Sequence, residues 1–379
     1  MRPRRAIVIV LVVALTAVLL FIMPPYLHGA AFVVRAAGMD GVAARLAKWD
    51  EVAVAERELT IPSRFGPLRA REYTPARGLR RRILLVPGVH AAGIDEPRLV
   101  GFARQIAAEG HDVTTVQLDD LAHYMITTRT TDMIEDAAIA LAKNRAAPIG
   151  MMGISFGGGL TIVAAGRPSV RGRVAWAMAL GGHGDLPRTL RYLCTGVQPD
   201  GKLRPAHDYG VAIVLLGVAD RVVPADQAGP LRTAILSYLE ASRLDMIDKT
   251  KAAVEFVRAK TLAEGLAEPA RTYMGYVNAR DVAHLGPVLL PVVGAAGGDP
   301  ALSPSRSAAP AAPVYLLHGT DDNVVPAIES TLLAKDLESR GVTVHVLLTP
   351  LITHAEVDRS STASAVWRLI DFWARLLTE

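Results

Sequence analysis

The sequence has 379 residues, of which 51% are hydrophobic and 21% charged, enough for one large α/β domain with an insertion or for two ordinary domains. This composition excludes intrinsic disorder and a collagen-like repeat. The single cysteine, Cys194, excludes a disulfide framework and a multi-cysteine metal site. Residues 1–35 hold four arginines and no acids, which accounts for the whole net charge of +4. The rest of the chain has no net charge, so the sequence does not indicate a nucleic-acid-binding surface.

The amino terminus carries a long apolar run. Residues 6–23 are 18 uncharged residues, which as a helix would extend about 27 Å and just span the hydrocarbon core of a bilayer. Three arginines precede the run, so the positive-inside rule predicts a single-pass membrane anchor with a cytoplasmic amino terminus. The bulk of the protein would lie on the opposite side, periplasmic or extracellular. Pro24-Pro25 is expected to end this helix. The alternatives are a buried core helix and a signal peptide cleaved near Val34-Arg35-Ala36, which would make the protein secreted.

After residue 55, short apolar runs alternate with helical patterns. The apolar runs predict strands at 58–61, 68–73, 83–86, 112–117, 149–153, 174–180, 314–318 and 343–349. The helical patterns lie at 96–109, 132–145, from 156 onward, 327–339 and 362–377. The first two strands flank a turn and are expected to form a hairpin. The alternation that follows is typical of parallel βαβ units, so the sequence predicts a doubly wound α/β protein with helices on both faces of the sheet.

A long insertion interrupts this alternation. It shows helical patterns at 227–244 and 246–266, followed by a Gly-, Ala-, Pro- and Ser-rich linker at 294–313. The segment 214–224 weakly echoes 315–326, but two copies do not define a repeat architecture. The chain is therefore divided into residues 1–25 (anchor or signal peptide), 26–55 (juxtamembrane segment), 56–183 (first part of the core), 184–312 (insertion and linker) and 313–379 (second part of the core).

One motif points to nucleophilic chemistry. Gly153-Ile154-Ser155-Phe156-Gly157 matches G-x-S-x-G between a predicted strand and a predicted helix. A serine on so tight a turn is exposed above the sheet, and glycine two residues away on either side avoids a collision. A serine hydroxyl becomes a good nucleophile when a histidine takes its proton and a carboxylate orients that histidine. The alternative is a glycine-rich helix start in which Ser155 is an ordinary N-cap.

Three further features accompany this turn: the run Leu84–Val89 after a predicted strand, the run Leu317–Pro326 (LHGTDDNVVP), and His354 after the last predicted strand. With them the chain resembles the α/β-hydrolase family, whose order of Ser, Asp and His it shares, over about two thirds of its length. The resemblance implies an α/β-hydrolase fold, in which the insertion forms a helical cap.

The resemblance also implies a catalytic triad. Ser155 would be the nucleophile and His354 the base, and Asp322 matches the family's acid in H-G-x-x-D-x-x-V-P. Asp185 and Asp220, which are both expected to follow strands, stay open as alternative acids because a neighbouring strand end can supply the acid without changing the triad geometry.

Two backbone N–H groups are implied as donors to the oxyanion, those of Val89 and Phe156. The family often has His-Gly before the donor that corresponds to Val89, where this chain has Pro87-Gly88.

Three other histidines also follow predicted strands, and we expect them to pack or to line the pocket rather than to act as the base: His90, His183 and His318.

These features predict a membrane-anchored serine hydrolase that cleaves carboxylic esters or related acyl bonds. No cofactor is expected, because the sequence lacks H-E-x-x-H, C-x-x-C, a Walker A lysine and a dinucleotide-binding glycine motif. The predicted partners are a small-molecule or lipid-like acyl substrate and the membrane. The alternatives are an acyltransferase on the same triad and a catalytically silent, membrane-tethered binding protein. A basic run at residues 77–82 is a solvated turn or contacts anionic lipid near the anchor. Nothing indicates the oligomeric state.

Overall fold

The computed structural model describes residues 16, 23–49, 51–143, 147–245, 247–352 and 363–379. Residues 6–15 and 17–22 of the apolar run, and the predicted base His354, lie outside these ranges. Within the described ranges, no helix combines the length and the apolar character that crossing a bilayer requires.

The core is one eight-stranded sheet with the strand order β1-β2-β4-β3-β5-β6-β7-β8. In chain order the strands are β1 (Val54–Ile61), β2 (Leu68–Pro75), β3 (Arg82–Val86), β4 (Asp112–Val116), β5 (Ile149–Ile154), β6 (Val174–Leu180), β7 (Val314–Gly319) and β8 (Val344–Thr349). β2 pairs antiparallel with both of its neighbours, and every pairing from β4 to β8 is parallel. The predicted hairpin and doubly wound class are confirmed.

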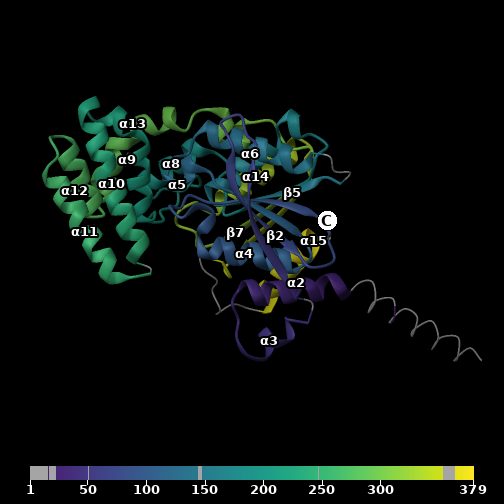
Figure 1. Cartoon of the computed structure of the whole chain (residues 1–379). Coiled ribbons are helices and arrows are strands. Elements are labelled where there is room, and N and C mark those ends of the chain that lie inside the picture. The colour runs from purple at the N-terminus through teal and green to yellow at the C-terminus, as the bar shows by residue number, and fades with distance from the viewer. Residues whose placement is uncertain (1–15, 17–22, 50, 144–146, 246, 353–362) are drawn as a thin grey trace, which may run out of the picture.

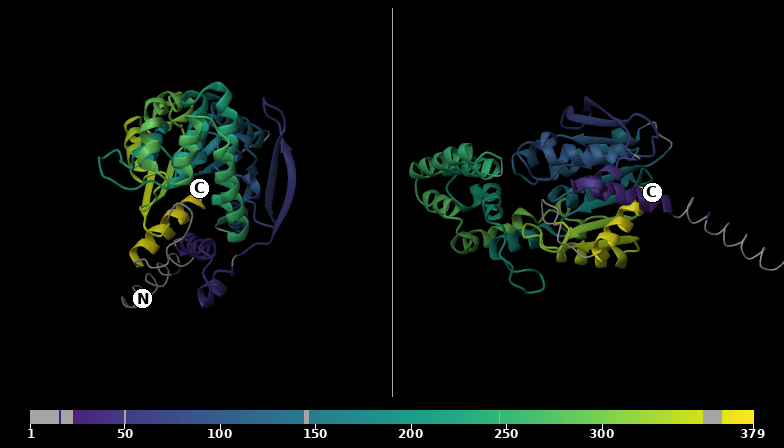
Figure 2. Two further views of the ribbon diagram at one scale, coloured as in Figure 1. Left: turned by 90° about the vertical axis from the view of Figure 1, so that its left-hand side faces the viewer. Right: turned by 90° about the horizontal axis from the view of Figure 1, so that it is seen from below.

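Two helical layers cover the sheet (Figures 1 and 2). One face packs against α6 (Thr128–Ala142), α7 (Phe156–Ala165) and α14 (Ile328–Ser339), and the other against α2 (Met23–Ala36), α4 (Pro97–Ala108) and α15 (Ala363–Leu376). Strand β3 shows why such strands read as continuous apolar runs: Leu84 and Val86 belong to one core cluster and Ile83 and Leu85 to the other. Two short helices lie outside these layers, α3 (Gly41–Leu46), which has no buried residue, and α5 (Asp119–Ala122).

Side-chain caps decide where several of these helices begin. Glu96 accepts a hydrogen bond from the Leu99 N–H and starts α4 where the sequence places it. Thr127 accepts one from the Thr130 N–H, so α6 begins four residues before the predicted 132.

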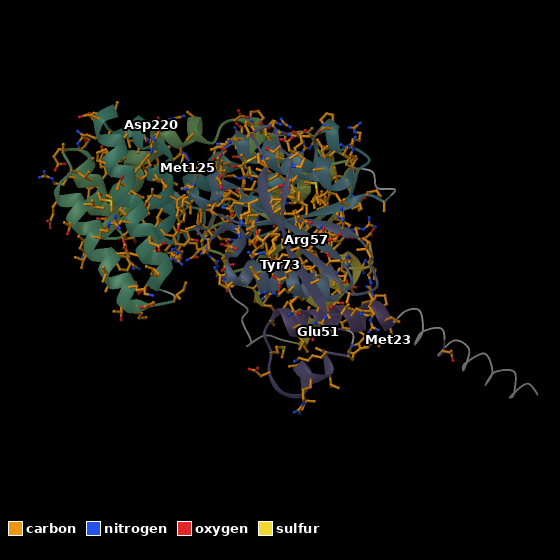
Figure 3. The ribbon with its side chains drawn as sticks, viewed as in Figure 1. Met23, Glu51, Arg57, Tyr73, Met125 and Asp220 are labelled. Atoms are coloured by element: carbon orange, nitrogen blue, oxygen red, sulfur yellow. The ribbon has the colours of Figure 1, made fainter. Side chains whose placement is uncertain are left out.

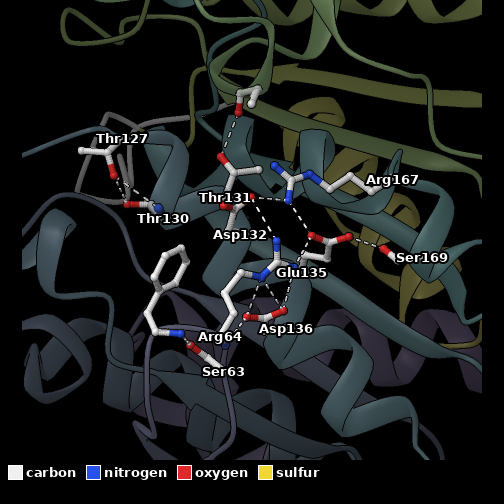
Figure 4. A network of polar contacts seen from close by, with 12 residues as sticks. Ser63, Arg64, Thr127, Thr130, Thr131, Asp132, Glu135, Asp136, Arg167 and Ser169 are labelled. Carbon is white, nitrogen blue, oxygen red and sulfur yellow. Dashed lines mark hydrogen bonds and ion pairs between the residues drawn. The ribbon is translucent and has the colours of Figure 1, made fainter.

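A partly buried ion network connects α6 to the β1–β2 turn and to Arg167 (Figure 4). Arg64 of the β1–β2 turn lies 2.7 Å from Asp136, and Arg167 lies 2.5 Å from Glu135.

The insertion is a helical cap beyond the carboxyl ends of the parallel strands (Figure 1). Its helices are α8 (Leu186–Thr195), α9 (Asp208–Val222), α10 (Ala225–Asp245), α11 (Lys249–Glu264), α12 (Ala270–Asn278) and α13 (Val282–Ala296). The chain returns through two short 3-10 helices, Pro300–Leu302 and Pro304–Arg306, within the stretch predicted as a linker. The prediction that a strand precedes Asp220 is wrong, because residues 208–222 form α9. An apolar run covered on all sides suits a buried helix as well as a strand.

The segment predicted as juxtamembrane (26–55) contains most of α2, which packs against the α/β core. Phe32 is fully buried, with its ring centroid 4.5 Å from that of Trp373 in α15. Arg35 pairs with the buried Glu109 at the end of α4. Pro24 and Pro25 lie within α2, and the expectation that they end the helix of the apolar run stays a prediction, because residues 17–22 of that run lie outside the described ranges.

Candidate active site

Ser155 lies on a sharp turn between β5 and α7 and is buried. Its φ of 53° and ψ of −132° are unusual for a residue other than glycine. A Cβ on Gly153 would lie 2.3 Å from Thr161 Oγ1, and one on Gly157 would lie 2.0 Å from the Pro87 carbonyl oxygen. The predicted steric role of both glycines is confirmed. The N-cap alternative is wrong, because the Ser155 side chain makes no capping hydrogen bond to α7.

The loop after β3 lies against this turn. A Cβ on Gly88 would be 3.3 Å from Ser155 Cβ and 3.3 Å from the Ile154 carbonyl oxygen. The next residue in this loop is Val89, and Phe156 directly follows the serine. Within the described part of the chain, neither the Val89 N–H nor the Phe156 N–H has a hydrogen-bond acceptor. Two backbone donors beside a serine are what an oxyanion site requires.

Parallel register brings Asp322 to the same edge of the sheet. The Ser155 N–H donates to the Leu180 carbonyl at 2.7 Å, and the Gly181 N–H donates to the Leu317 carbonyl at 2.8 Å, so the ends of β5, β6 and β7 lie side by side. A Cβ on Gly181 would be 3.4 Å from Asp322 Oδ2.

The Asp322 carboxylate is buried and held by its own loop. Its Oδ1 accepts hydrogen bonds from the Val324 N–H at 2.8 Å and the Val325 N–H at 2.9 Å. Its Oδ2 lies 3.4 Å from His318 Nε2, and the fully buried His318 ring also contacts the Ser330 hydroxyl at 2.7 Å. These contacts fix the direction of the carboxylate.

The two alternative acids are engaged elsewhere. Asp185 caps α8 by accepting from the Arg188 N–H, and its other oxygen lies 2.6 Å from Arg306 Nε. Asp220 lies on α9, is exposed, and pairs with Arg232 (Figure 3).

Each of the other three histidines packs as expected. His90 Nδ1 accepts from the Ala92 N–H at 3.2 Å, and burial lowers the pKa of its ring. The fully buried His183 contacts the Leu302 carbonyl at 2.8 Å through Nε2. His318 lies in β7 and contacts the Asp322 carboxylate.

The cap reaches the site from two sides. At the start of α9, the His207 N–H donates to the Asn323 carbonyl beside Asp322 at 2.9 Å. Burial raises the pKa of Tyr209, the second residue of α9, and the nearby negative charge of Asp322 adds to this effect. Near the oxyanion loop, burial raises the pKa of Tyr124 to about 12, and Glu240 of α10 adds to it.

Tyr124 and Tyr209 are partly buried aromatic residues of this region that sequence reasoning did not single out. A lone tyrosine has no motif around it, and its place near a pocket depends on tertiary packing. A hint was available for Tyr124, which follows a strand by a short helix at the carboxyl edge of the sheet.

The described residues contain no group of three or more His, Cys, Asp or Glu side chains able to hold a metal ion. A cavity of about 370 Å³ lies elsewhere, at the amino ends of the parallel strands, and its lining includes His28, Arg80 and His111. It belongs to the opposite edge of the sheet from Ser155.

Three comparisons with known proteins were informative to different degrees. No protein-family model matches the sequence, and no curated protein matches it. Similar solved structures include an esterase of Pyrobaculum calidifontis, which is 16% identical with a TM-score of 0.45 over 93% of this chain and 92% of that chain. A brefeldin A esterase, described as a bacterial homologue of human hormone-sensitive lipase, is 15% identical with a TM-score of 0.45, covering 92% of this chain and 81% of that chain.

The acylaminoacyl peptidase of Pyrococcus horikoshii is 14% identical with a TM-score of 0.48 over 90% of this chain, which spans 44% of that longer protein. Each likeness concerns the fold alone. The mostly parallel sheet, the strained serine turn after β5 and the acid after β7 give this chain the α/β-hydrolase fold.

Proposed function

We propose that this protein is a membrane-anchored serine hydrolase that cleaves carboxylic esters or related acyl bonds through Ser155, His354 and Asp322. The observation that carries the proposal is the turn at Ser155, where a buried serine with positive φ lies beside two backbone N–H groups that lack acceptors among the described residues. Strained backbone of this kind persists where the surrounding structure enforces it, most often at functional sites.

In the proposed reaction, His354 takes the proton of the Ser155 hydroxyl as its oxygen attacks the acyl carbon. The oxyanion that forms accepts hydrogen bonds from the N–H groups of Val89 and Phe156. His354 then protonates the leaving group, and the acyl-enzyme is hydrolysed by water that gives its proton to the same histidine. Asp322 stays ionised and orients the imidazole throughout.

The substrate class follows from the surroundings of the serine. Met125 lies where the core joins the cap (Figure 3), and with Val89, Tyr124 and Tyr209 it is one of the partly buried apolar and aromatic side chains that pack against the larger core cluster. Such a lining favours a hydrophobic acyl or aromatic group over a sugar or a phosphate.

The anchor in this proposal is the apolar run 6–23, with the amino terminus in the cytoplasm and the catalytic domain on the opposite, periplasmic or extracellular side. The three arginines that precede the run support this orientation.

The test is covalent labelling of the full chain with a fluorophosphonate probe, which reacts with activated serines. We expect labelling of the wild-type protein and its loss in Ser155→Ala and His354→Ala. Asp322→Asn should label far more slowly, because the wrong tautomer of the histidine costs roughly 10⁴-fold in such a triad. Asp220→Asn, a change at an exposed ion pair, is the matched control and should label normally.

Failure of a folded wild-type protein to label would contradict the proposal and favour the binding-protein alternative. Slow labelling of Asp220→Asn with normal labelling of Asp322→Asn would reassign the acid. Product analysis with added acceptor alcohols then separates hydrolysis from acyl transfer, because a transferase forms the new ester at acceptor concentrations far below that of water.

A further inference from the structure

We propose that one face of the catalytic domain, built from α2, α3, the turn before β3 and Trp367 of α15, lies directly on the lipid bilayer. We call it the α2–α3 face. It comprises the exposed residues Met23, Leu27, Met39, Val42, Leu46, Trp49, Arg77, Leu79, Arg80 and Trp367. The inference rests on the membrane anchoring proposed above and is independent of the chemistry at Ser155.

Ring contacts show that parts of this face lie together. The Trp49 ring centroid is 5.2 Å from that of His28 in α2, and Trp367 of α15 stacks on Tyr26 of α2 at 5.3 Å. A cleft of about 280 Å³ is lined by His28 together with Arg77 and Arg80, which places the basic turn beside α2 as well. Met23 and Glu51 lie on this lower side of the molecule, and Asp220 marks the distant cap (Figure 3).

The apolar side chains of the face have no role in the core. Val42 and Leu46 are four residues apart on α3, so they share one side of that helix, and both are exposed. Trp49 is 60% exposed and Trp367 is 56% exposed, whereas the other two tryptophans, Trp176 and Trp373, are 1% and 4% exposed. Large apolar side chains gathered on a surface mark a site of contact, and exposed tryptophan is typical of the membrane interface.

The charges of the face suit lipid headgroups. The side chains of Arg77 and Arg80 are exposed and make no hydrogen bond or ion pair with the described residues. Exposed Arg45 and Lys48 of the α3 region add two cations. The acidic residues nearby in the sequence are Asp40, Asp50 and Glu51. Arginine and lysine beside apolar anchors bind lipid phosphates.

Position along the chain selects the bilayer as the occupant. The apolar run 6–23 ends at the first residue of α2, and α2 is fixed to the domain by the buried Phe32 and by the pairing of Arg35 with Glu109. A span that leaves the bilayer at Met23 therefore meets the domain at this face, with no flexible linker between them.

The experiment uses the full chain reconstituted into phosphatidylcholine vesicles, with vesicle flotation as the measure of anchoring. Tryptophan fluorescence is compared between ordinary lipid and lipid with brominated acyl chains, which quench only tryptophans near the hydrocarbon region. We expect quenching in the wild-type protein, a partial loss of quenching in Trp49→Phe or Trp367→Phe, and loss of nearly all of it in the double variant. Trp176 and Trp373, which are buried, serve as internal controls.

A matched control places a tryptophan elsewhere. Val257→Trp on the exposed side of α11 in the cap, made in the double variant, should show no quenching. Flotation without quenching of Trp49 and Trp367 would overturn the α2–α3 face and leave the anchor intact. Equal quenching at position 257 would also overturn it. Absence of flotation would overturn both anchor and face, while fluorophosphonate labelling of the same samples reports separately on the proposed catalytic function.

Discussion

Ser155 holds a backbone conformation that costs on the order of 1–3 kcal/mol for a residue other than glycine. Its neighbours enforce that conformation. The Ser155 N–H is bonded to β6, and its carbonyl accepts from the Gly158 N–H at 2.8 Å, so the chain turns within three residues. The room for this turn comes from Gly153 and Gly157, against which the Thr161 hydroxyl and the Pro87 carbonyl pack. The strain is thus coupled to the position of the loop that carries Val89.

The first prediction concerns that coupling. Gly157→Ala would place a Cβ 2.0 Å from the Pro87 carbonyl oxygen, so the loop must shift and the Val89 N–H must move away from the oxyanion. We expect a folded protein whose fluorophosphonate labelling and kcat/KM fall by roughly 10²-fold, the cost of losing one oxyanion donor. Gly217→Ala on α9 is the control, because a Cβ there meets no atom within 4 Å. Wild-type activity of Gly157→Ala would contradict the coupling.

At the scale of residues, sequence succeeds where chemistry restricts the choice of side chain. Glycine at 153 and 157 is the one solution to the crowding at the turn, so the five-residue motif is enough to identify Ser155 as the nucleophile candidate. Tyr124 and Tyr209 have no such restriction, since many large side chains fill a pocket. Nothing in the described residues tests the assignment of His354, so its role stays a prediction.

The two connections between core and cap form one buried network. Glu329 of α14 is fully buried and accepts from the Gly184 N–H and the Asp185 N–H, each at 3.0 Å. Its carboxylate also lies 2.6 Å from Arg188 at the start of α8. Asp185 in turn pairs with Arg306, where the chain returns from the cap. The entry and exit of the cap are therefore joined to each other and to the helix behind the Asp322 loop.

The second prediction is that this network, unlike a surface pair, stabilises the fold. Burial raises the pKa of Asp185, but the Arg306 pair and the Arg188 N–H outweigh it and hold the pKa below its usual value. A carboxyl with a lowered folded pKa contributes stability above its unfolded pKa and loses it as the pH falls through the folded value. Asp185→Asn should therefore lower the free energy of unfolding by about 1–3 kcal/mol near pH 7, with the deficit shrinking below about pH 4.

Denaturant unfolding of both proteins at several pH values measures this difference. Asp220→Asn is the control, because its exposed pair with Arg232 should contribute about 0–1 kcal/mol. Equal losses in the free energy of unfolding for the two substitutions would contradict the prediction that this network stabilises the fold. So would a loss for Asp185→Asn that does not become smaller in acid. Normal fluorophosphonate labelling of Asp185→Asn is also expected, since the Asp185 carboxylate bonds to the Arg188 N–H and to Arg306.

At the scale of elements, alternation of apolar runs and helical patterns predicts the sheet well. The strands buried on both faces, such as β3 and β5, are short and flanked by turn residues, which separates them from helices. The prediction failed at residues 214–220, where an apolar run inside the cap forms part of α9. Periodicity alone does not distinguish a buried helix from a buried strand, and the resemblance of this segment to 315–326 favoured the wrong one.

At the scale of the whole molecule, α2 fixes the first part of the described chain to the α/β core. It contacts α15, α4 and α3, so the helix that begins at Met23 packs against the helix that ends at Leu376 (Figure 2). The sequence alone does not reveal this, because residues 26–36 are mostly apolar and next to the predicted anchor, and the partners of Arg35 in α4 and just after it, Gln105 and Glu109, lie 70 and 74 positions away. Phe32→Ala should lower the free energy of unfolding by about 3–5 kcal/mol, whereas Leu27→Ala on the exposed side of α2 should change it by about 0.5 kcal/mol or less.

The same packing argues against cleavage at Val34-Arg35-Ala36. These residues form the last turn of α2, and a peptidase cutting after Ala36 would remove Phe32 from the core and separate the buried Glu109 from Arg35. Loss of one partner from a buried ion pair costs about 3–5 kcal/mol, in addition to the cavity that Phe32 would leave. We therefore expect the folded, probe-labelled protein isolated from membranes to yield peptides covering residues 24–36 by mass spectrometry. A labelled, stable protein whose first residue is 37 would contradict this, because the α/β core would then fold without α2.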